Sequence, residues 1–573
     1  MTQSQPRFKA LGRFSLNVVS IAAIALGIFL RIINLGSREY WYDEALSIVF
    51  VSGQRNVYSN PGEVPVNLDS YTALLHIPPG SGLSEMAANL ANVLRGITNN
   101  QHAPLFYLFH NFWMRLFGNS EIAMRSLVVL MSIAAIASVY GLGRKLLGHR
   151  GGLIVAALLA TNPFYLAQSL HFRMHGALPF WAALSGWAML NLTGRKNLSS
   201  EVTNRDVSAL SPRRSLYAEL AWSAILIGSV TAGLLTNYLF SYWALSLAVL
   251  SLYLDRRRWF LHGVRLALAG ALTVPWILWG VRQQLRNARF VLDQFGANEG
   301  ESVALRHLQD VLTFFGTQFI LGEWTSNLPP ASVMVAGAIA IALFLAAIVH
   351  LWKVGLRQSF TVALLLSVLP LTLGIIVDSL TTKFTVGWGG GRAVLFILPG
   401  FLLLLAVWIE RAAGRWRNLA ASGLLVFFLT VGILDYTVRD RAMFHQVADA
   451  IASQPNTPTL IAMNSRAWGH VLRLAYYVPP TANVDLLARD PADLAPALEK
   501  VLNADNSPYS RILWLDAEKS VWSPNATPAQ NQQVERLLDE AFCQTLSSCL
   551  SSETLQLSGT MELDEFNLQI YSR

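Results

Sequence analysis

Long apolar stretches recur along most of the chain and dominate its pattern of hydrophobic and polar positions. A helix needs roughly 20 apolar residues to cross a bilayer. About eleven stretches approach that length, near residues 15–35, 121–143, 151–170, 174–193, 218–236, 238–254, 259–280, 331–352, 359–378, 393–409 and 418–435. The pattern predicts a polytopic α-helical membrane domain over residues 1–435.

The tail of the chain, residues 436–573, has a different pattern. Apolar runs shorten to the length of strands at 459–463 and 511–515, and the stretch 555–571 resembles two strands. Between them lie helical patterns, at 467–477, 491–502 and 528–546. This alternation predicts a small α/β domain.

Composition supports a membrane protein and excludes an ordinary soluble one. The chain of 573 residues is 53% hydrophobic and 14% charged, with a mean hydropathy of +0.40. Soluble domains carry about 25% charged residues. The first apolar run follows Arg7, Lys9 and Arg13 and has no small-residue cleavage site after it, so we expect a retained signal anchor.

The distribution of positive charge sets the expected orientation. With a cytoplasmic N-terminus, the internal loops hold 19 Lys and Arg, whereas the external loops hold 11 in more than twice the length. The positive-inside rule favours this arrangement. The net charge of +8 is thus a topology signal rather than a sign of nucleic-acid binding. We expect a multi-pass protein of the plasma (inner) membrane with the α/β domain on the extracytoplasmic side.

One long external loop, residues 36–120, interrupts the predicted membrane domain. Two of its segments, 84–97 and 104–117, have helical periodicity but are too polar or too short to span, which predicts helices lying in the membrane interface. The alternative, 104–117 as a short span, reverses every later loop and conflicts with the Lys/Arg count. In a second loop, 281–330, four arginines nearly balance five acids, so most of these charges are expected to be solvated.

The only two cysteines, Cys543 and Cys549, lie in the predicted external tail. Their spacing suits a small disulfide loop in an oxidising compartment. Two buried thiols are the alternative.

The strongest candidate for chemistry is the acidic pair Asp43-Glu44, which follows the first apolar stretch and is flanked by aromatic residues. Carboxylates at a bilayer surface are costly to place and are natural general bases. One carboxylate could accept a hydroxyl proton while the other orients the substrate. The alternative role for both acids is capping of a helix.

Cations on the same predicted side supply candidate phosphate ligands. Arg125 lies about one turn inside the second span and needs an acid, a phosphate or the interface as a partner. Arg173 lies in the short loop 168–175, and Lys383 and Arg392 flank a run of three glycines whose backbone amides could approach an anion. The alternatives are snorkelling for Arg125 and a flexible turn for the glycines.

Histidines and aromatic residues complete the candidate site. His102 and Tyr107 frame the sequence His-Ala-Pro-Leu-Phe-Tyr, which alone is also typical of a helix cap. His171 and His175 have the spacing of two metal ligands on a helix, but no third ligand is evident, so no metal site is predicted. Tyr40, Trp41, Tyr42 and Trp388 could stack on sugars, although an interfacial aromatic belt explains them more simply.

With these residues in view, the chain resembles the membrane glycosyltransferases of the GT-C fold. It is most similar to the group of protein O-mannosyltransferases and aminoarabinose transferases that use polyprenyl-phosphate sugars. The resemblance rests on five motifs in order: Asp43-Glu44; His102 to Tyr107, where the group often has His-Pro-Pro-Leu-Tyr-Tyr; Gly118 to Ser126; Gln168 to Met174; and Arg392 to Pro399. It covers residues 15–195 and 388–410 well. Ala103 and His175 depart from the usual Pro and Tyr.

The resemblance implies an inverting transfer of a sugar from a polyprenyl-phosphate donor to a hydroxyl or phosphate of a protein, lipid or glycan acceptor. Asp43 would act as the base or orient the acceptor, with Glu44 as its partner. Arg125, Arg173, Lys383 and Arg392 would hold the donor phosphate. Related oligosaccharyltransferases use a divalent cation. Here the loop at 171–175 has no acid, so we expect metal-independent chemistry in which cations neutralise the leaving phosphate.

A transporter or lipid flippase is the main alternative function. It predicts ionisable residues near the bilayer midplane and broken helices in two related halves. Only Glu219, near a helix start, and Asp378, at a helix end, stand out, and no internal repeat is evident. A structural or sensor protein would leave Asp43-Glu44 and the cationic loops unexplained.

Overall fold

The computed structural model describes residues 16–80, 82–193, 212–287, 296, 302–355, 357–438, 442–504, 508–519, 521, 524–542, 554–558 and 565–572. Cys543 and Cys549, and with them the predicted disulfide, lie outside these residues.

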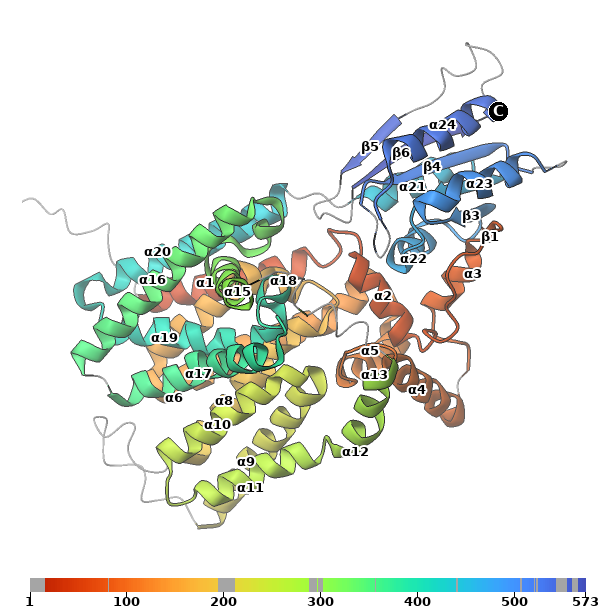
Figure 1. Ribbon diagram of the computed structural model, residues 1–573. Helices are drawn as coiled ribbons and strands as arrows, with labels where there is room; N and C mark the ends of the chain where they lie inside the picture. The colour runs from red at the N-terminus through yellow and green to blue at the C-terminus, as the bar shows by residue number, and fades with distance from the viewer. Residues whose placement is uncertain are drawn as a thin grey trace, which may run out of the picture.

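Long helices form a bundle, and the α/β domain packs at one end of it (Figure 1). The bundle helices are α1 (Leu16–Ile33), α6 (Glu121–Thr161), α7 (Pro163–Ser169), α8 (Leu178–Thr193), α9 (Pro212–Thr236), α10 (Ser241–Leu254), α11 (Trp259–Ala271), α12 (Val274–Trp276), α13 (Arg282–Asn287), α15 (Val303–Gly316), α16 (Pro330–Val354), α17 (Arg357–Thr381), α18 (Trp388–Gly391), α19 (Leu398–Arg411) and α20 (Arg417–Val438). Each of the eleven predicted spans coincides with helical structure, which confirms a multi-pass membrane fold.

The candidate spans in the described part of the chain are fewer and less uniform in length than predicted. Within the described residues, eight helices are long and apolar enough to cross a membrane. One of them, α6, contains the segment predicted at 121–143 and the first part of that predicted at 151–170, whose remainder forms α7. Helix α6 breaks at Gly148, whose φ is +82°. Beyond the break the two arms touch, since a Cβ built on Gly143 would lie 3.0 Å from the Cα of Gly152. Two predicted spans are shorter, with 16 residues in α8 and a shorter apolar helix at Tyr238–Leu254.

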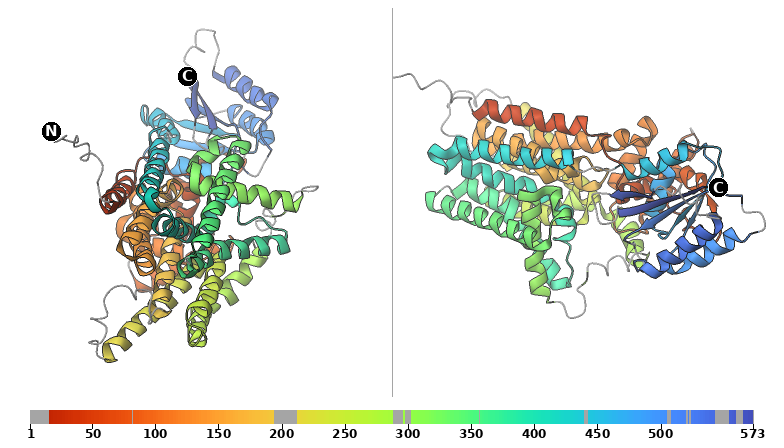
Figure 2. Two further views of the ribbon diagram at one scale, coloured as in Figure 1. Left: turned by 90° about the vertical axis from the view of Figure 1, so that its left-hand side faces the viewer. Right: turned by 90° about the horizontal axis from the view of Figure 1, so that it is seen from above.

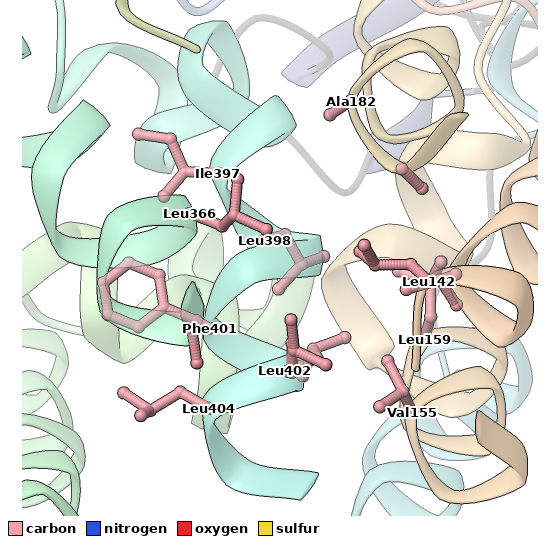
Figure 3. Packing of buried hydrophobic residues seen from close by; sticks show 14 of the residues in the cluster. Leu142, Val155, Leu159, Ala182, Leu366, Ile397, Leu398, Phe401, Leu402 and Leu404 are labelled. Carbon is pink, nitrogen blue, oxygen red and sulfur yellow. The ribbon is translucent and has the colours of Figure 1, made fainter. Parts of the chain in front are cut away.

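Helix α19 forms the centre of the apolar core (Figure 3). Leu402 of α19, Leu366 of α17 and Leu142 of α6 belong to one apolar cluster and are fully buried. Phe401 of α19 points away from Leu142 and packs on Phe315 and Phe344. The contact with α17 is close because a Cβ on Gly400 would lie 1.8 Å from the Leu366 carbonyl oxygen. Small residues allow membrane helices to approach in this way. The segment that precedes α19 is therefore attached to a closely packed helix.

The C-terminal domain is a six-stranded sheet in the order β1-β3-β2-β4-β6-β5. Strands β2 (Thr459–Met463), β3 (Val484–Ala488) and β4 (Arg511–Ala517) are parallel, whereas β6 (Glu565–Ser572) and β5 (Thr554–Ser558) add antiparallel edges. Helices α21 (Met443–Ala452) and α22 (Trp468–Tyr477) share one apolar cluster with the strands, and α23 (Pro491–Leu502) and α24 (Pro528–Phe542) share the other. Alternate residues of each strand point to opposite faces, so the sheet has helices on both sides.

The loop 36–120 joins the two parts of the molecule. It forms α2 (Tyr42–Val51), β1 (Val66–Asn67), α3 (Asp69–Thr72), α4 (Leu83–Ile97) and α5 (Leu105–Phe117), at the bundle end that faces the sheet (Figures 1 and 2). Strand β1 pairs antiparallel with β3 of the C-terminal sheet. The fully buried Glu39 accepts hydrogen bonds from the backbone N–H of His445, 2.6 Å, and from its ring, 2.8 Å. The segments predicted at 84–97 and 104–117 are helical. The division of the chain at residue 435 stays a prediction, since β1 comes from the N-terminal part.

Candidate active site

Helix α2 presents the acidic pair. It begins after Trp41, whose backbone N–H donates to the Glu44 carboxylate over 2.8 Å, so Glu44 caps the helix that contains it. Carboxylates in a first turn are also favoured by the helix dipole. The two side chains differ in exposure: Asp43 is 22% exposed, and Glu44 is fully buried.

Glu44 is committed to structure. It accepts two hydrogen bonds from Arg125, 3.0 and 2.9 Å long, and one from the backbone N–H of Phe172. Burial alone would raise the pKa of Glu44, but the charge and hydrogen bonds of Arg125 and the backbone donors outweigh it, so the pKa is lowered. A carboxylate with this set of partners is an anchor rather than a group that contacts substrate.

The contacts of Arg125 contradict its predicted role as a ligand of the donor phosphate. Its Nη1 donates to the carbonyls of Leu35 and Arg38, and Nη2 donates to that of Glu39, in addition to the two bonds with Glu44. All five guanidinium donors are therefore used. Arg125 cannot hold a donor phosphate in this arrangement, because it fixes the turn after α1 to α2.

Asp43 lies between two arginines. Its Oδ2 is 3.5 Å from Nη2 of Arg173 and 3.4 Å from Nη2 of Arg392. Arg173 also donates to the Asp43 carbonyl, 3.1 Å, and to the Ser47 hydroxyl, 2.9 Å. The Nε atoms of both arginines are buried without a hydrogen-bond partner in the part of the chain that the structure describes. These free donors make the pair suited to an anion.

The glycine run positions Arg392. Gly389, Gly390 and Gly391 have φ values of +56°, +67° and +84°, a region that favours glycine. Gln318 donates to the carbonyls of Gly390 and Gly391 over 3.4 and 3.3 Å. The turn is therefore ordered, and it leads into η7 (Arg392–Ile397) and α19.

Two indole rings hold the guanidinium of Arg392 in place. It lies 4.2 Å from the Trp388 ring centroid and 4.8 Å from that of Trp41. Contacts of this kind orient a guanidinium without using its N–H donors. The two tryptophans thus contribute to the site and do not serve only as a membrane belt.

His102 and Tyr107 lie next to the arginines. The His102 Nε2 is 3.4 Å from Nη2 of Arg173, and the rings of His102 and Tyr107 stack with their centroids 6.1 Å apart. Burial, followed by the charges of Arg173 and Arg392, lowers the pKa of His102 well below its ordinary value, so the ring is neutral at pH 7. Burial raises the pKa of Tyr107 to about 12.

His175 lies in a small adjoining cavity of 160 Å³, which it lines together with His102 and Trp388. Lys383 is not among the described residues that line this cavity or the two below. Its backbone forms a bridge with Gly296.

Two larger cavities are lined by the two partners of the Asp43–Arg392 contact, one by each residue. The first, of 430 Å³, is lined by Arg392, Trp41, Gly389 and Gly390 together with residues of α7, α15, η5 (Thr317–Leu321), η6 (Gly322–Asn327) and α16. The second, of 530 Å³, is lined by Asp43 and Arg173 together with residues of the first loop and of the C-terminal domain. The first cavity is bordered by membrane-type helices, and the second opens between the two domains.

Sequence reasoning missed Glu323. It is only 8% exposed, lines the first cavity and accepts a hydrogen bond of 2.6 Å from Gln168. We expected the acids of loop 281–330 to be solvated. The signal that could have identified it is the apolar run Phe319-Ile320-Leu321 just before it. Within the described ranges, no group of three or more His, Cys, Asp or Glu is arranged to hold a metal ion.

Part of the chain matches a known family, and most of the chain is similar to solved structures. Residues 101–200 match the family described as Dolichyl-phosphate-mannose-protein mannosyltransferase. No curated protein matches the chain. One similar solved structure is an oligosaccharyltransferase of Archaeoglobus fulgidus in complex with Zn and sulfate, 12% identical, with a TM-score of 0.46 and coverage of 87% of this chain and 67% of that one. Another is ArnT from Cupriavidus metallidurans bound to undecaprenyl phosphate, 13% identical, with a TM-score of 0.40 and coverage of 96% and 97%.

The family match includes His102, Tyr107, Arg125, Arg173 and His175. Over residues 101–200 it confirms the similarity to the GT-C membrane glycosyltransferases that the sequence motifs predicted.

Proposed function

We propose that this protein is an inverting glycosyltransferase that moves a sugar from a polyprenyl-phosphate donor to an acceptor on the extracytoplasmic face of the membrane. The family that matches residues 101–200 is named for dolichyl-phosphate-mannose, a sugar on a polyprenyl phosphate. The orientation follows from the Lys/Arg distribution of the loops.

One observation carries the proposal: a partly exposed carboxylate, Asp43, touches two largely buried arginines, and these three residues line two cavities. The carboxylate can serve as a base, and the two arginines, which contact it, can bind an anion directly beside it. The fully paired Glu44 beside it keeps α2 in place, so Asp43 does not depend on solvent for its position.

In the proposed reaction the donor phosphate binds at Arg392 and Arg173, and the acceptor hydroxyl hydrogen-bonds to Asp43. Asp43 accepts the hydroxyl proton as the acceptor oxygen bonds to the anomeric carbon. The bond from that carbon to the phosphate oxygen breaks, and the polyprenyl phosphate leaves with the electron pair. A single displacement inverts the anomeric centre. The two guanidinium groups stabilise the charge that develops on the phosphate.

The cavities suit the two substrates of such a reaction. The first is bordered by membrane helices and includes Phe164, Leu328 and Val333 as apolar lining, as a lipid-linked donor requires. The second lies between the domains and opens at the carboxylate itself.

Asp43→Asn tests the proposal. The protein, reconstituted with a radiolabelled polyprenyl-phosphate sugar and a crude acceptor extract, should lose transfer by about a hundredfold or more, since a positioned base contributes roughly 10²–10⁴. Asp69→Asn is the matched control, because Asp69 is an exposed acid of the same loop. Full transfer by Asp43→Asn, with both variants folded, would reject Asp43 as the base. Absence of transfer by the folded wild-type protein would favour a transporter.

A further inference from the structure

The C-terminal domain forms one wall of the second cavity with residues at one edge of its sheet. Arg466 and Trp468 follow β2, Asp490 follows β3, and Val521 follows β4, and all four line the cavity. These are the carboxyl ends of three adjacent parallel strands. Chain order switches sides at β2, since β3 lies on one side of it and β4 on the other. Ligands of open α/β sheets bind at such a point.

The charges in this cavity do not balance. Arg466 pairs with Asp490 over 2.5 Å, and Asp43 is shared by Arg173 and Arg392. The remaining charged residue of the lining, Arg55, forms no ion pair and no hydrogen bond with any described residue. Its guanidinium carbon lies 4.3 Å from the ring centroid of Trp468, and it also interacts electrostatically with Tyr58, which carries no full counter-charge.

Arg55 is also held away from water. Its side chain is partly buried, its Nε is buried without a hydrogen-bond partner, and burial lowers its pKa. A desolvated cation without a counter-charge is unfavourable unless a ligand supplies one. The fork of a guanidinium matches phosphate and carboxylate oxygens.

The rest of the lining is polar and suited to hydroxyl groups. Gln101 has a buried Oε1 without a hydrogen-bond partner in the described structure. Further amides and aromatic rings of the same cavity are Asn60, Asn99, Asn100, Tyr58 and Trp468. Amide side chains beside aromatic rings offer both donors and acceptors and an apolar face.

We propose that the second cavity binds an acceptor that is an anionic glycan, with its phosphate or carboxylate on Arg55 and its reacting hydroxyl on Asp43. The ends of β2 and β3 in the C-terminal domain form the opposite wall and select this acceptor. The inference rests on the proposed function, because it assigns the substrate class of the same site. It assigns to the C-terminal domain the recognition of the acceptor.

Binding without turnover tests this assignment separately from the reaction. The full-length protein in phosphatidylcholine nanodiscs is mixed with glucose 6-phosphate, galacturonate or glucose, and saturation-transfer NMR measures weak binding. We expect the two anionic sugars to bind at least about tenfold better than glucose, as one charge-assisted hydrogen-bond pair allows. Arg55→Gln should remove this preference.

Arg95→Gln is the matched control, because it removes the same charge from an exposed position on α4 outside the cavity. It should leave the preference unchanged. Asp43→Asn should retain binding of the anionic sugars even where it abolishes transfer, so failure of the catalytic proposal and failure of this one are distinguishable. If Arg55→Gln does not fold, the preference of the wild-type protein for anionic over neutral sugar still decides.

A second set of nanodiscs contains phosphatidylglycerol and identifies the source of the anion. Suppression of sugar binding by this lipid supports a lipid-borne phosphate, and unchanged binding supports a soluble or polymeric acidic glycan. Equal binding of glucose and the anionic sugars, no saturation transfer from any anionic sugar, or an unchanged preference in Arg55→Gln would each overturn the inference.

Discussion

Adjacent carboxylates of α2 should respond in opposite ways to the same chemical change. Glu44→Gln and Asp43→Asn each remove one negative charge and keep the size of the side chain. Glu44 is fully buried and accepts two hydrogen bonds from Arg125 and one each from Phe172 and Trp41. Asp43 has a partly exposed carboxylate with two looser contacts. We expect the first change to affect stability and the second to affect transfer.

The cost of Glu44→Gln follows from these contacts. A glutamine amide accepts on one oxygen only, so at least one of the two carboxylate oxygens loses its donors and Arg125 keeps an uncompensated buried charge. Breaking a buried ion pair in this way costs about 3–5 kcal/mol. Replacing both partners, as in Glu44→Gln with Arg125→Met, should recover part of that loss, since the stranded charge is gone.

Thermal unfolding of the purified protein, followed by fluorescence, measures the effect. Glu44→Gln should melt several degrees below wild type, and Asp43→Asn should melt within a degree or so of it. Because the pKa of Glu44 is lowered by folding, its contribution is complete above the unfolded value of about 4.3 and is lost as the pH falls through the lower folded value. Equal melting temperatures for the two variants, or no gain in the double variant, would refute this account.

Three further predictions concern the cations and His102. Arg392→Lys keeps the charge but loses the planar fork between two tryptophans, and we expect transfer to fall about tenfold to a hundredfold in steady-state assays, whereas unchanged kinetics would contradict the phosphate role. Transfer should persist in EDTA, since two arginines already supply positive charge at Asp43; loss that Mn²⁺ or Mg²⁺ restores would indicate a metal. His102 resists protonation in the folded protein, so wild-type melting temperature should fall as the pH drops below about 6.5, and His102→Gln should flatten that slope.

Apolar periodicity was sufficient to predict the long bundle helices, because each has a long continuous apolar surface. It missed α15, which lies within the loop expected at 281–330. The same reasoning found β2 and β4, whose runs Thr459–Met463 and Arg511–Ala517 are almost uniformly buried. It missed β3, where Asp485 interrupts a short run. It also missed β1, a strand of two residues, Val66 and Asn67, whose pairing depends on a distant partner.

The candidate site was predictable in residue type but not in role. Asp43, Arg173 and Arg392 were expected to act together, and the structure brings them into contact. Nothing local in the sequence distinguishes Arg125 from these cations, since its five hydrogen bonds come from residues that the fold alone brings near. No pattern in the sequence identified Arg55 as a candidate site residue. Its position beside Trp468 depends on how two separate segments meet.

The pairing of β1 with β3 also bears on how the protein is made and dissected. The ribosome delivers Val66 and Asn67 long before Val484–Ala488 exists, so the edge of β1 must stay accessible until the last part of the chain arrives. Truncation after the bundle would leave that loop with an unmatched edge, and the tail expressed alone would lack a border strand. Questions about this tail are therefore better asked with point substitutions than with deletions.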